Sequence, residues 1–261
     1  MKRLRPFDLA LPASLAEAAA LLAASGGEAR VLAGGTDLLV DMKLGKARPP
    51  MLVGLRLVPG LDEIARVPGG VRIGALARAE GIAGSSLVAD GWRALSRAAA
   101  VLGSPPIRRL ATIGGNLGRG SPASDLAPAL LVHGAVVHVI GVAGERSIPL
   151  EDLHYGPGTT ALEPAEIITG IFLPDPAGRS GSAHQKLGRR GGGWDLAVAG
   201  ASAARALDEE GRVAAARVAL SSVGPTVLRA REAEEALVGR LPDHATLAAA
   251  ARAAAGAARP I

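Results

Sequence analysis

Two short segments combine paired glycines with small polar side chains, Ala33-Gly34-Gly35-Thr36-Asp37 and Thr112-Ile113-Gly114-Gly115-Asn116. Paired glycines let backbone N–H groups approach a ligand closely, and a helix start that follows adds further donors for an anion. Together the segments suit a pyrophosphate. Neither matches the Gly-x-x-x-x-Gly-Lys-Ser/Thr or Gly-x-Gly-x-x-Gly pattern of common nucleotide loops, and each glycine pair alone is explained as well by a tight turn at positive φ.

Cysteine and histidine, the other residue types that commonly bind metals or act in catalysis, indicate no further site. The chain has no cysteine, so it cannot form a thiolate zinc site, an all-cysteine iron–sulfur cluster or a cysteine nucleophile. His133 and His138 are five residues apart on an expected strand, which would place them on opposite faces and make a poor metal pair. His154 reads as a loop histidine. We therefore expect neither a metal site nor a catalytic triad.

Composition indicates an ordered globular protein, with 49% hydrophobic and 20% charged residues among 261. The net charge of +5 comes mostly from scattered arginines, since the only lysines are Lys2, Lys43, Lys46 and Lys186. No basic run is interleaved with aromatics, which argues against nucleic acid and favours an anionic small ligand or an acidic partner.

Two apolar stretches could be a signal peptide or a transmembrane segment. The N-terminal stretch is interrupted by Asp8, Pro12 and Glu17, so it does not read as a signal peptide. Residues 126–144 lack Lys, Arg, Asp and Glu, but Pro128 and a change from Ala/Leu to Val/Ile favour a buried helix followed by a strand. We expect a soluble cytoplasmic protein without a transmembrane segment.

Helix and strand patterns alternate irregularly, so the expected class is α+β. Ser14 and Glu17 form a capping box at the first helix start. We expect three units: residues 1–58, residues 59–177 and residues 178–261. Expected helices cover residues 14–25, 38–44, 92–102, 125–132, 227–238 and 244–255, and expected strands cover residues 30–33, 51–55, 64–67, 71–73, 135–142, 167–173, 197–207 and 213–220.

The motifs occur in the order and spacing of a known family. The sequence resembles the flavin subunits of molybdopterin dehydrogenases, which are the medium subunits of bacterial carbon monoxide dehydrogenase and relatives and correspond to the central domain of xanthine dehydrogenase. The resemblance covers nearly the whole chain and is carried by residues 31–43, 111–116, 121–125, 155–159, 162–168, 186–190 and 219–226. It implies a two-part FAD-binding domain followed by a C-terminal domain of the CO dehydrogenase flavoprotein type.

Residue roles follow from the resemblance. It implies that two segments hold non-covalent FAD through backbone and short side chains, with Leu32, Ala33, Gly34, Gly35, Thr36, Asp37 and Leu38 in the first and Ala111, Thr112, Ile113, Gly114, Gly115 and Asn116 in the second. Asp125 matches an aspartate that binds the adenosine part, although it would also serve as a helix N-cap. Ile168 matches a residue packed on the isoalloxazine, or else a core residue. Lys186 matches a catalytic-site cation near the flavin, or else an exposed lysine.

The resemblance also implies partners. A large molybdopterin subunit and a small [2Fe-2S] subunit would hold the other cofactors, in a heterotrimer that dimerises. This chain would accept electrons from the iron–sulfur partner and pass them to a quinone, NAD or oxygen. Two other functions are a stand-alone FAD-dependent oxidoreductase and a non-redox nucleotide-binding scaffold. Arg119 departs from the family's smaller residues, and Asp195 follows a slightly lengthened stretch.

Overall fold

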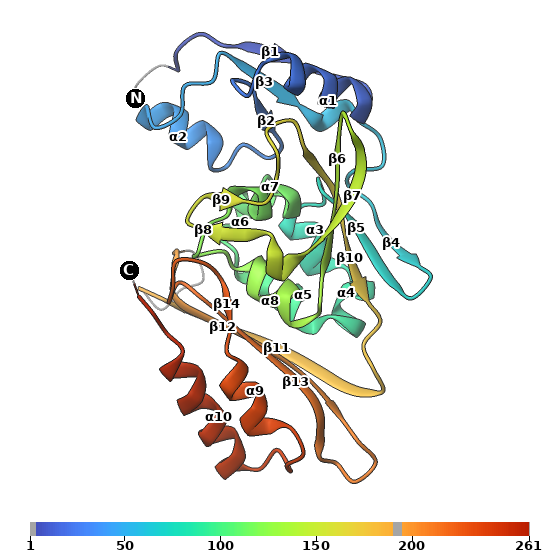
Figure 1. The fold of residues 1–261 in the computed structure, drawn as a ribbon, viewed down its shortest axis with the longest axis vertical. Helices are drawn as coiled ribbons and strands as arrows, with labels where there is room; N and C mark the ends of the chain where they lie inside the picture. Colours follow the sequence, from blue (N-terminus) through green and yellow to red (C-terminus); the bar gives the residue numbers. More distant parts are fainter. Residues whose placement is uncertain (1–3, 190–194, 261) are drawn as a thin grey trace.

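The computed structural model describes residues 4–189 and 195–260, and within them three sheets of three or more strands follow one another along the long axis of the molecule (Figure 1). The first sheet is parallel, with strand order β1-β3-β2. Its elements are β1 (Asp8–Ala10), α1 (Leu15–Ala24), β2 (Arg30–Leu32), α2 (Leu38–Leu44) and β3 (Met51–Gly54), with a 3₁₀ turn at Leu55–Leu57. Helix α1 begins as predicted, because Ser14 accepts a hydrogen bond from the Glu17 amide.

The second sheet is antiparallel, with order β4-β5-β10-β6-β7, and helices pack beside it around Trp92, which is 1% exposed. Its strands are β4 (Ile64–Val67), β5 (Gly70–Gly74), β6 (Val136–Gly141), β7 (Gly144–Pro149) and β10 (Ile167–Pro174). The helices are α3 (Ala79–Gly84), α4 (Ser86–Gly91), α5 (Arg93–Val101), α6 (Pro105–Arg108), α7 (Ile113–Arg119) and α8 (Leu126–Val132), and a small ribbon joins β8 (His154–Gly156) to β9 (Thr159–Thr160).

The third sheet, β11-β12-β13-β14, is antiparallel and lies between α5 and α8 on one face and the last two helices on the other (Figure 1). It comprises β11 (Arg179–Gly188), β12 (Ala197–Leu207), β13 (Val213–Ser221) and β14 (Leu228–Arg229), followed by α9 (Arg231–Leu237) and α10 (His244–Gly256). The face toward α9 and α10 forms an apolar cluster that includes Val213, Leu220 and Leu237.

The predicted α+β class is confirmed, and several elements differ from the expectation. Strand β11 was not predicted, because its Gly-, Ser- and Ala-rich sequence lacks β-branched residues and depends on pairing with β12. Strand β7 and the β8–β9 ribbon were also missed. His133 ends α8 and His138 lies in β6, so the prediction that both share one strand was wrong. The second glycine segment is not a turn but the start of α7.

The apolar stretch at residues 126–144 is a buried helix followed by a strand, as predicted. No helix in the described parts of the chain is both long enough and apolar enough to span a membrane. The same parts contain no cluster of three or more His, Cys, Asp or Glu residues that would hold a metal ion.

Candidate functional site

A cavity of about 840 Å³ brings the predicted site residues together. Its walls come from all three units, since Lys186, Asp195 and Leu196 of the last unit join the first two. Among the predicted residues that line it are Leu32, Ala33, Gly34, Gly35, Thr36, Asp37, Leu38, Ala111, Thr112, Gly114, Gly115, Asn116, Asp125, Ile168 and Lys186. Ile113 is the exception, because its side chain lies fully buried in the core instead. The size is within the range of about 300–1,000 Å³ that is usual for ligand sites.

The first glycine segment offers backbone donors. Gly35 has φ of +70°, as predicted, and the chain then enters α2. Within the described residues, none of the amides from Gly34 to Leu38 donates to a protein acceptor. Gly34 is required for a different reason: an added Cβ would lie 1.8 Å from the Leu110 carbonyl oxygen. Because the Gly34 backbone lies so close to the Leu110 carbonyl, the free N–H groups of residues 34–38 lie beside the second segment.

The second segment works differently. The amides of Ile113 and Gly114 donate to the carbonyls of Ala77 and Ala75 at 3.0 and 2.8 Å. The Gly115 and Asn116 amides both donate to Thr112, to its hydroxyl and its carbonyl respectively. The prediction that Gly115 takes positive φ is wrong, because Gly115 is helical. That this segment holds the FAD phosphates stays a prediction. Thr112, Gly114, Gly115 and Asn116 all line the cavity, and Gly115 is exposed.

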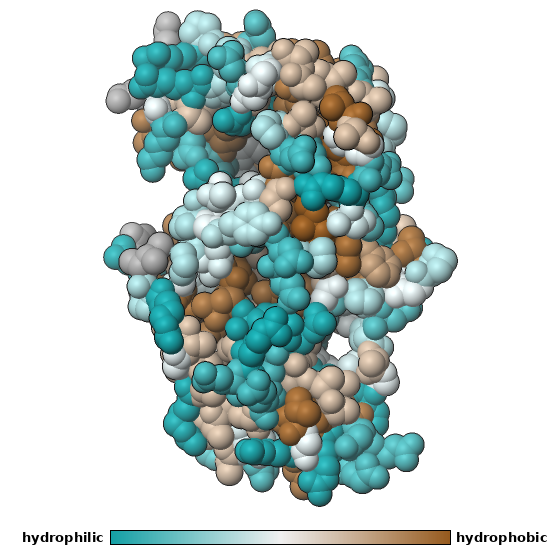
Figure 2. All heavy atoms as spheres, viewed as in Figure 1, coloured by the Kyte–Doolittle hydropathy of each residue, from teal (hydrophilic) through white to brown (hydrophobic). Residues whose placement is uncertain are grey.

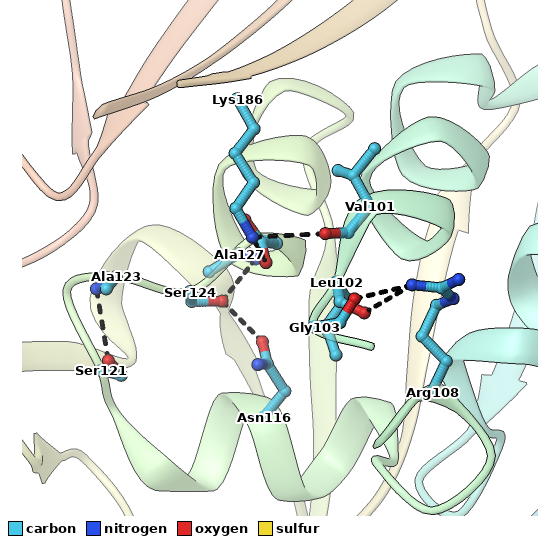
Figure 3. A network of polar contacts seen from close by, with 11 residues as sticks. Val101, Leu102, Gly103, Arg108, Asn116, Ser121, Ala123, Ser124, Ala127 and Lys186 are labelled. Atoms are coloured by element: carbon cyan, nitrogen blue, oxygen red, sulfur yellow. Dashed lines mark hydrogen bonds and ion pairs between the residues drawn. The ribbon is translucent and has the colours of Figure 1, made fainter. Parts of the chain in front are cut away.

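Behind this segment a hydrogen-bond network fixes the start of α8 (Figure 3). The Ser124 hydroxyl donates to Asn116 Oδ1 at 2.5 Å and accepts from the Ala127 amide at 3.0 Å. Since Oδ1 is used, the Asn116 side-chain NH₂ is oriented to donate elsewhere. Ser124, rather than Asp125, therefore caps α8, and the alternative role of Asp125 as an N-cap is wrong, because its side chain makes no capping bond.

Asp125 instead pairs with Lys186. Lys186 Nζ lies 2.8 Å from Asp125 Oδ2 and 3.2 Å from the Val101 carbonyl oxygen. The two side chains are only 3% and 8% exposed, so the alternative of an exposed lysine is wrong. Burial raises the pKa of Asp125, and the hydrogen bond and charge of Lys186 only partly oppose it. Asp125 Oδ1 is buried without a hydrogen-bond partner in the described protein, and so one strong acceptor is left for a ligand.

Strand β11 positions Lys186 by holding both ends of α5. Ser182 Oγ accepts from the Ala94 amide at the start of α5, and Lys186 Nζ bonds the Val101 carbonyl at its end. His184, between them on the same face, bonds the Ser202 hydroxyl at 2.9 Å. Figure 3 shows Lys186 reaching from β11 toward Val101. The C-terminal sheet is therefore docked through specific polar contacts at the base of the cavity.

The rest of the lining is mixed and includes an apolar part around Ile168. Ile168, 7% exposed, lies where the β10–β6 register shifts, and an added Cβ on Gly118 would meet its Cδ1 at 3.8 Å. Ile168 is therefore a core residue that also lines the cavity, and its packing on the isoalloxazine stays a prediction. Leu76, Leu102 and Ile107 also line the cavity. An apolar wall beside a strip of polar donors suits a ligand with a flat ring system and a charged tail.

Several lining residues were not among the predicted ones. Thr159 and Thr160 enter because the Gly158 amide bonds the Gly120 carbonyl at 2.9 Å, which ties the β8–β9 ribbon to α7. Arg119 enters through its ion pair with Asp41 of α2. No local pattern identifies such contacts. A smaller cavity of about 310 Å³ lies elsewhere, where Arg229 is already paired with Glu151 and Glu234.

Comparison with known families decides the identity. Residues 5–176 match the FAD binding domain in molybdopterin dehydrogenase, and residues 182–261 match the CO dehydrogenase flavoprotein C-terminal domain. The chain belongs to this flavoprotein family. The resemblance seen in the sequence is thus confirmed, and with it the oxidoreductase class and FAD as the family's cofactor.

Relatives of this flavoprotein family cover most of the chain. It is 35% identical over 95% of its length to the 6-hydroxypseudooxynicotine dehydrogenase complex subunit alpha of Paenarthrobacter nicotinovorans, covering 83% of that protein. It is also 35% identical over 92% of its length to the carbon monoxide dehydrogenase medium chain of Afipia carboxidovorans, again covering 83%. A solved carbon monoxide dehydrogenase from Hydrogenophaga pseudoflava, lacking the Mo-pyranopterin moiety, superposes with a TM-score of 0.94 at 34% identity, over 99% of this chain and 89% of that one.

Proposed function

We propose that this chain holds one non-covalent FAD in the 840 Å³ cavity and relays electrons from an iron–sulfur partner to an external acceptor. The observation that carries the proposal is the run of unengaged amides from Gly34 to Leu38, seated against the second segment at the edge of an apolar cavity. When bound, FAD supplies the redox chemistry, and the protein supplies position and electrostatics.

The residues present fit this cofactor. The amides of residues 34–38 would bind the pyrophosphate, helped by the hydroxyl of Thr112 and the side-chain NH₂ of Asn116. Asp125 Oδ1 is an orphaned buried acceptor that suits hydroxyl or amino donors of the adenosine part. Ile168 would pack on the ring system. Lys186 would act on that site chiefly through Asp125, because its charge is already balanced there.

The partners follow from the relatives. They are named as subunits or medium chains of dehydrogenases, including the xanthine dehydrogenase FAD-binding subunit of Escherichia coli. We propose a large molybdopterin subunit and a small [2Fe-2S] subunit as partners, in a heterotrimer that dimerises, and a cytoplasmic location. Without cysteine this chain cannot build a thiolate-ligated cluster, so electrons must enter from a partner docked beside the cavity.

The experiment compares the chain alone with the chain co-expressed with its genomic neighbours. Purified alone, it should carry one FAD that acid precipitation releases, and it should be reduced by dithionite but inert toward carbon monoxide, aldehydes and N-heterocycles. Oxidation should appear only in the assembled complex. A chain that takes up no flavin would instead support the scaffold function, and multiple turnover by the single chain would support the stand-alone oxidoreductase.

A further inference from the structure

The first unit is attached to the second on two sides of the cavity. On one side α1 and β3 pack against Ile140, Ala165 and Ile167 in a shared apolar cluster. On the other side, α2 faces α7 through an ion pair, with Asp41 Oδ2 2.9 Å from Arg119 Nη1. Figure 1 shows α1 beside β6 and α2 projecting at the opposite end of the first sheet, and Figure 2 shows a hollow in the surface below this projection.

Little besides this ion pair holds α2. None of its seven residues is buried, and Val40 and Leu44 are 50% and 61% exposed. Across the described residues, the Asp41–Arg119 contact is the only ion pair or side-chain hydrogen bond that joins residues 4–58 to the rest of the chain. Asp41 and Arg119 both line the cavity. The contact therefore lies where α2 borders the ligand space.

Glycines flank α2 at both ends. Gly35 before it has φ of +70°, and Gly45 after it has φ of +76° with only the Arg48 side chain near its Cβ position. Residues of this kind absorb the backbone rotation of a moving segment at low steric cost. A short, unburied helix between two such positions, fastened by one ion pair, has the construction of a hinged flap.

We propose that α2 is a flap over the cofactor cavity and that the Asp41–Arg119 ion pair is its latch. The proposal rests on the proposed function for the identity of the cofactor. The alternative is that Arg119 binds the FAD phosphates directly. It lies seven residues after Thr112, about 10 Å along the axis of α7, which places it away from the Thr112 hydroxyl and beside Asp41 of α2. Opening the latch would swing α2 away from the cavity together with the amides of residues 36–38, so FAD would enter or leave while the latch is open.

The test measures FAD release by recovery of flavin fluorescence, and hydrogen exchange of residues 38–44 in the FAD-free protein. The variants are Asp41→Asn, Arg119→Gln and the charge exchange Asp41→Arg/Arg119→Asp. Asp175→Asn is the control, because it breaks a second aspartate–arginine pair, with Arg66 at 2.8 Å, far from α2. Both single variants should speed FAD release about two- to fivefold, the range expected for one partly exposed ion pair, and should speed exchange in α2.

The charge exchange should restore both rates toward those of the natural protein, and the control should change neither. Faster release in Arg119→Gln together with unchanged or slower release in Asp41→Asn would overturn the latch, since it would mean that Arg119 holds FAD itself. Unchanged hydrogen exchange of α2 in both single variants would also overturn it. If the natural protein bound no FAD, the proposed function would fail, while the exchange measurement would still decide whether the ion pair fastens α2.

Discussion

Lys186 Nζ lies 2.8 Å from Asp125 Oδ2, which joins the C-terminal sheet to the start of α8 across 61 residues of sequence. Both side chains are almost fully buried, so removing one partner leaves an uncompensated charge. The pair therefore links the stability of the domain contact to the geometry of the cavity that Asp125 lines.

The first prediction concerns this coupling. Lys186→Met should lower the free energy of unfolding by about 3–5 kcal/mol, because Asp125 stays buried without its partner. The double variant Lys186→Met/Asp125→Leu should lose less than the sum of the two single variants. Urea unfolding of the FAD-free protein at neutral pH measures all three. Strictly additive losses would show that the two residues are not coupled.

The second prediction is the pH dependence of Lys186→Met. Lys186 is the group that opposes the burial-driven rise in the pKa of Asp125, so its loss should raise that pKa further. When the pKa of a carboxyl is higher in the folded protein than in the unfolded chain, the protein is most stable at pH values below the pKa of the unfolded chain. That stability is lost as the pH rises through the pKa of the folded protein. The variant should therefore be less destabilised at pH 5 than at pH 8. Equal destabilisation at both values would contradict this assignment.

The third prediction concerns His184, whose pKa burial lowers to about 4, with Lys186 and Arg97 adding to the effect. The unfolded chain takes up a proton near pH 6.5 and the folded chain does not, so stability present above pH 6.5 is lost as pH falls toward 4. The loss should be about 3 kcal/mol, from roughly 1.4 kcal/mol per pH unit. His184→Gln, which keeps a polar partner for Ser202, should show a shallower decline. Parallel curves for both proteins would refute the prediction.

The fourth prediction tests two requirements of the first segment with separate variants. They are the close contact of Gly34 with the Leu110 carbonyl and the positive φ of Gly35. Gly34→Ala should weaken FAD binding on the order of tenfold to a hundredfold, or about 1.4–2.8 kcal/mol, because the new Cβ would displace the Leu110 carbonyl. Gly35→Val should also weaken binding, because a β-branched residue disfavours φ of +70°. Gly81→Ala is the control: it lies in α3 with open space at its Cβ position. Flavin titration measures each affinity, and three equal affinities would make the segment purely structural.

The fifth prediction tests how the C-terminal sheet docks on α5. Ser182→Ala should cost about 1 kcal/mol of stability, as loss of a helix-capping hydroxyl does, since the Ala94 amide loses its acceptor. Ser180→Ala, on the same strand but exposed, should cost almost nothing. Urea unfolding compares the two variants. Equal costs would show that Ser182 does not cap α5.

The sequence alone determined what depends on neighbouring residues. The capping serine at position 14, the glycine turn at Gly35, helix α2 and the helix–strand succession at residues 126–141 all follow from local hydrogen bonding, backbone freedom and periodicity. The motif order also identified the family. These features were predictable because the residues that indicate each one are close together in the chain.

Tertiary structure decided which groups remain available for a ligand. The amides of Ile113 and Gly114 resemble those of Gly34 and Gly35 in sequence, but the carbonyls of a distant segment, Ala75 and Ala77, accept them. The pairing of Lys186 with Asp125, the strand β11 and the contact of α2 with Arg119 likewise depend on segments far apart in the chain. Hydrogen-bond satisfaction and charge pairing are properties of packed neighbours, and a local pattern does not specify those neighbours.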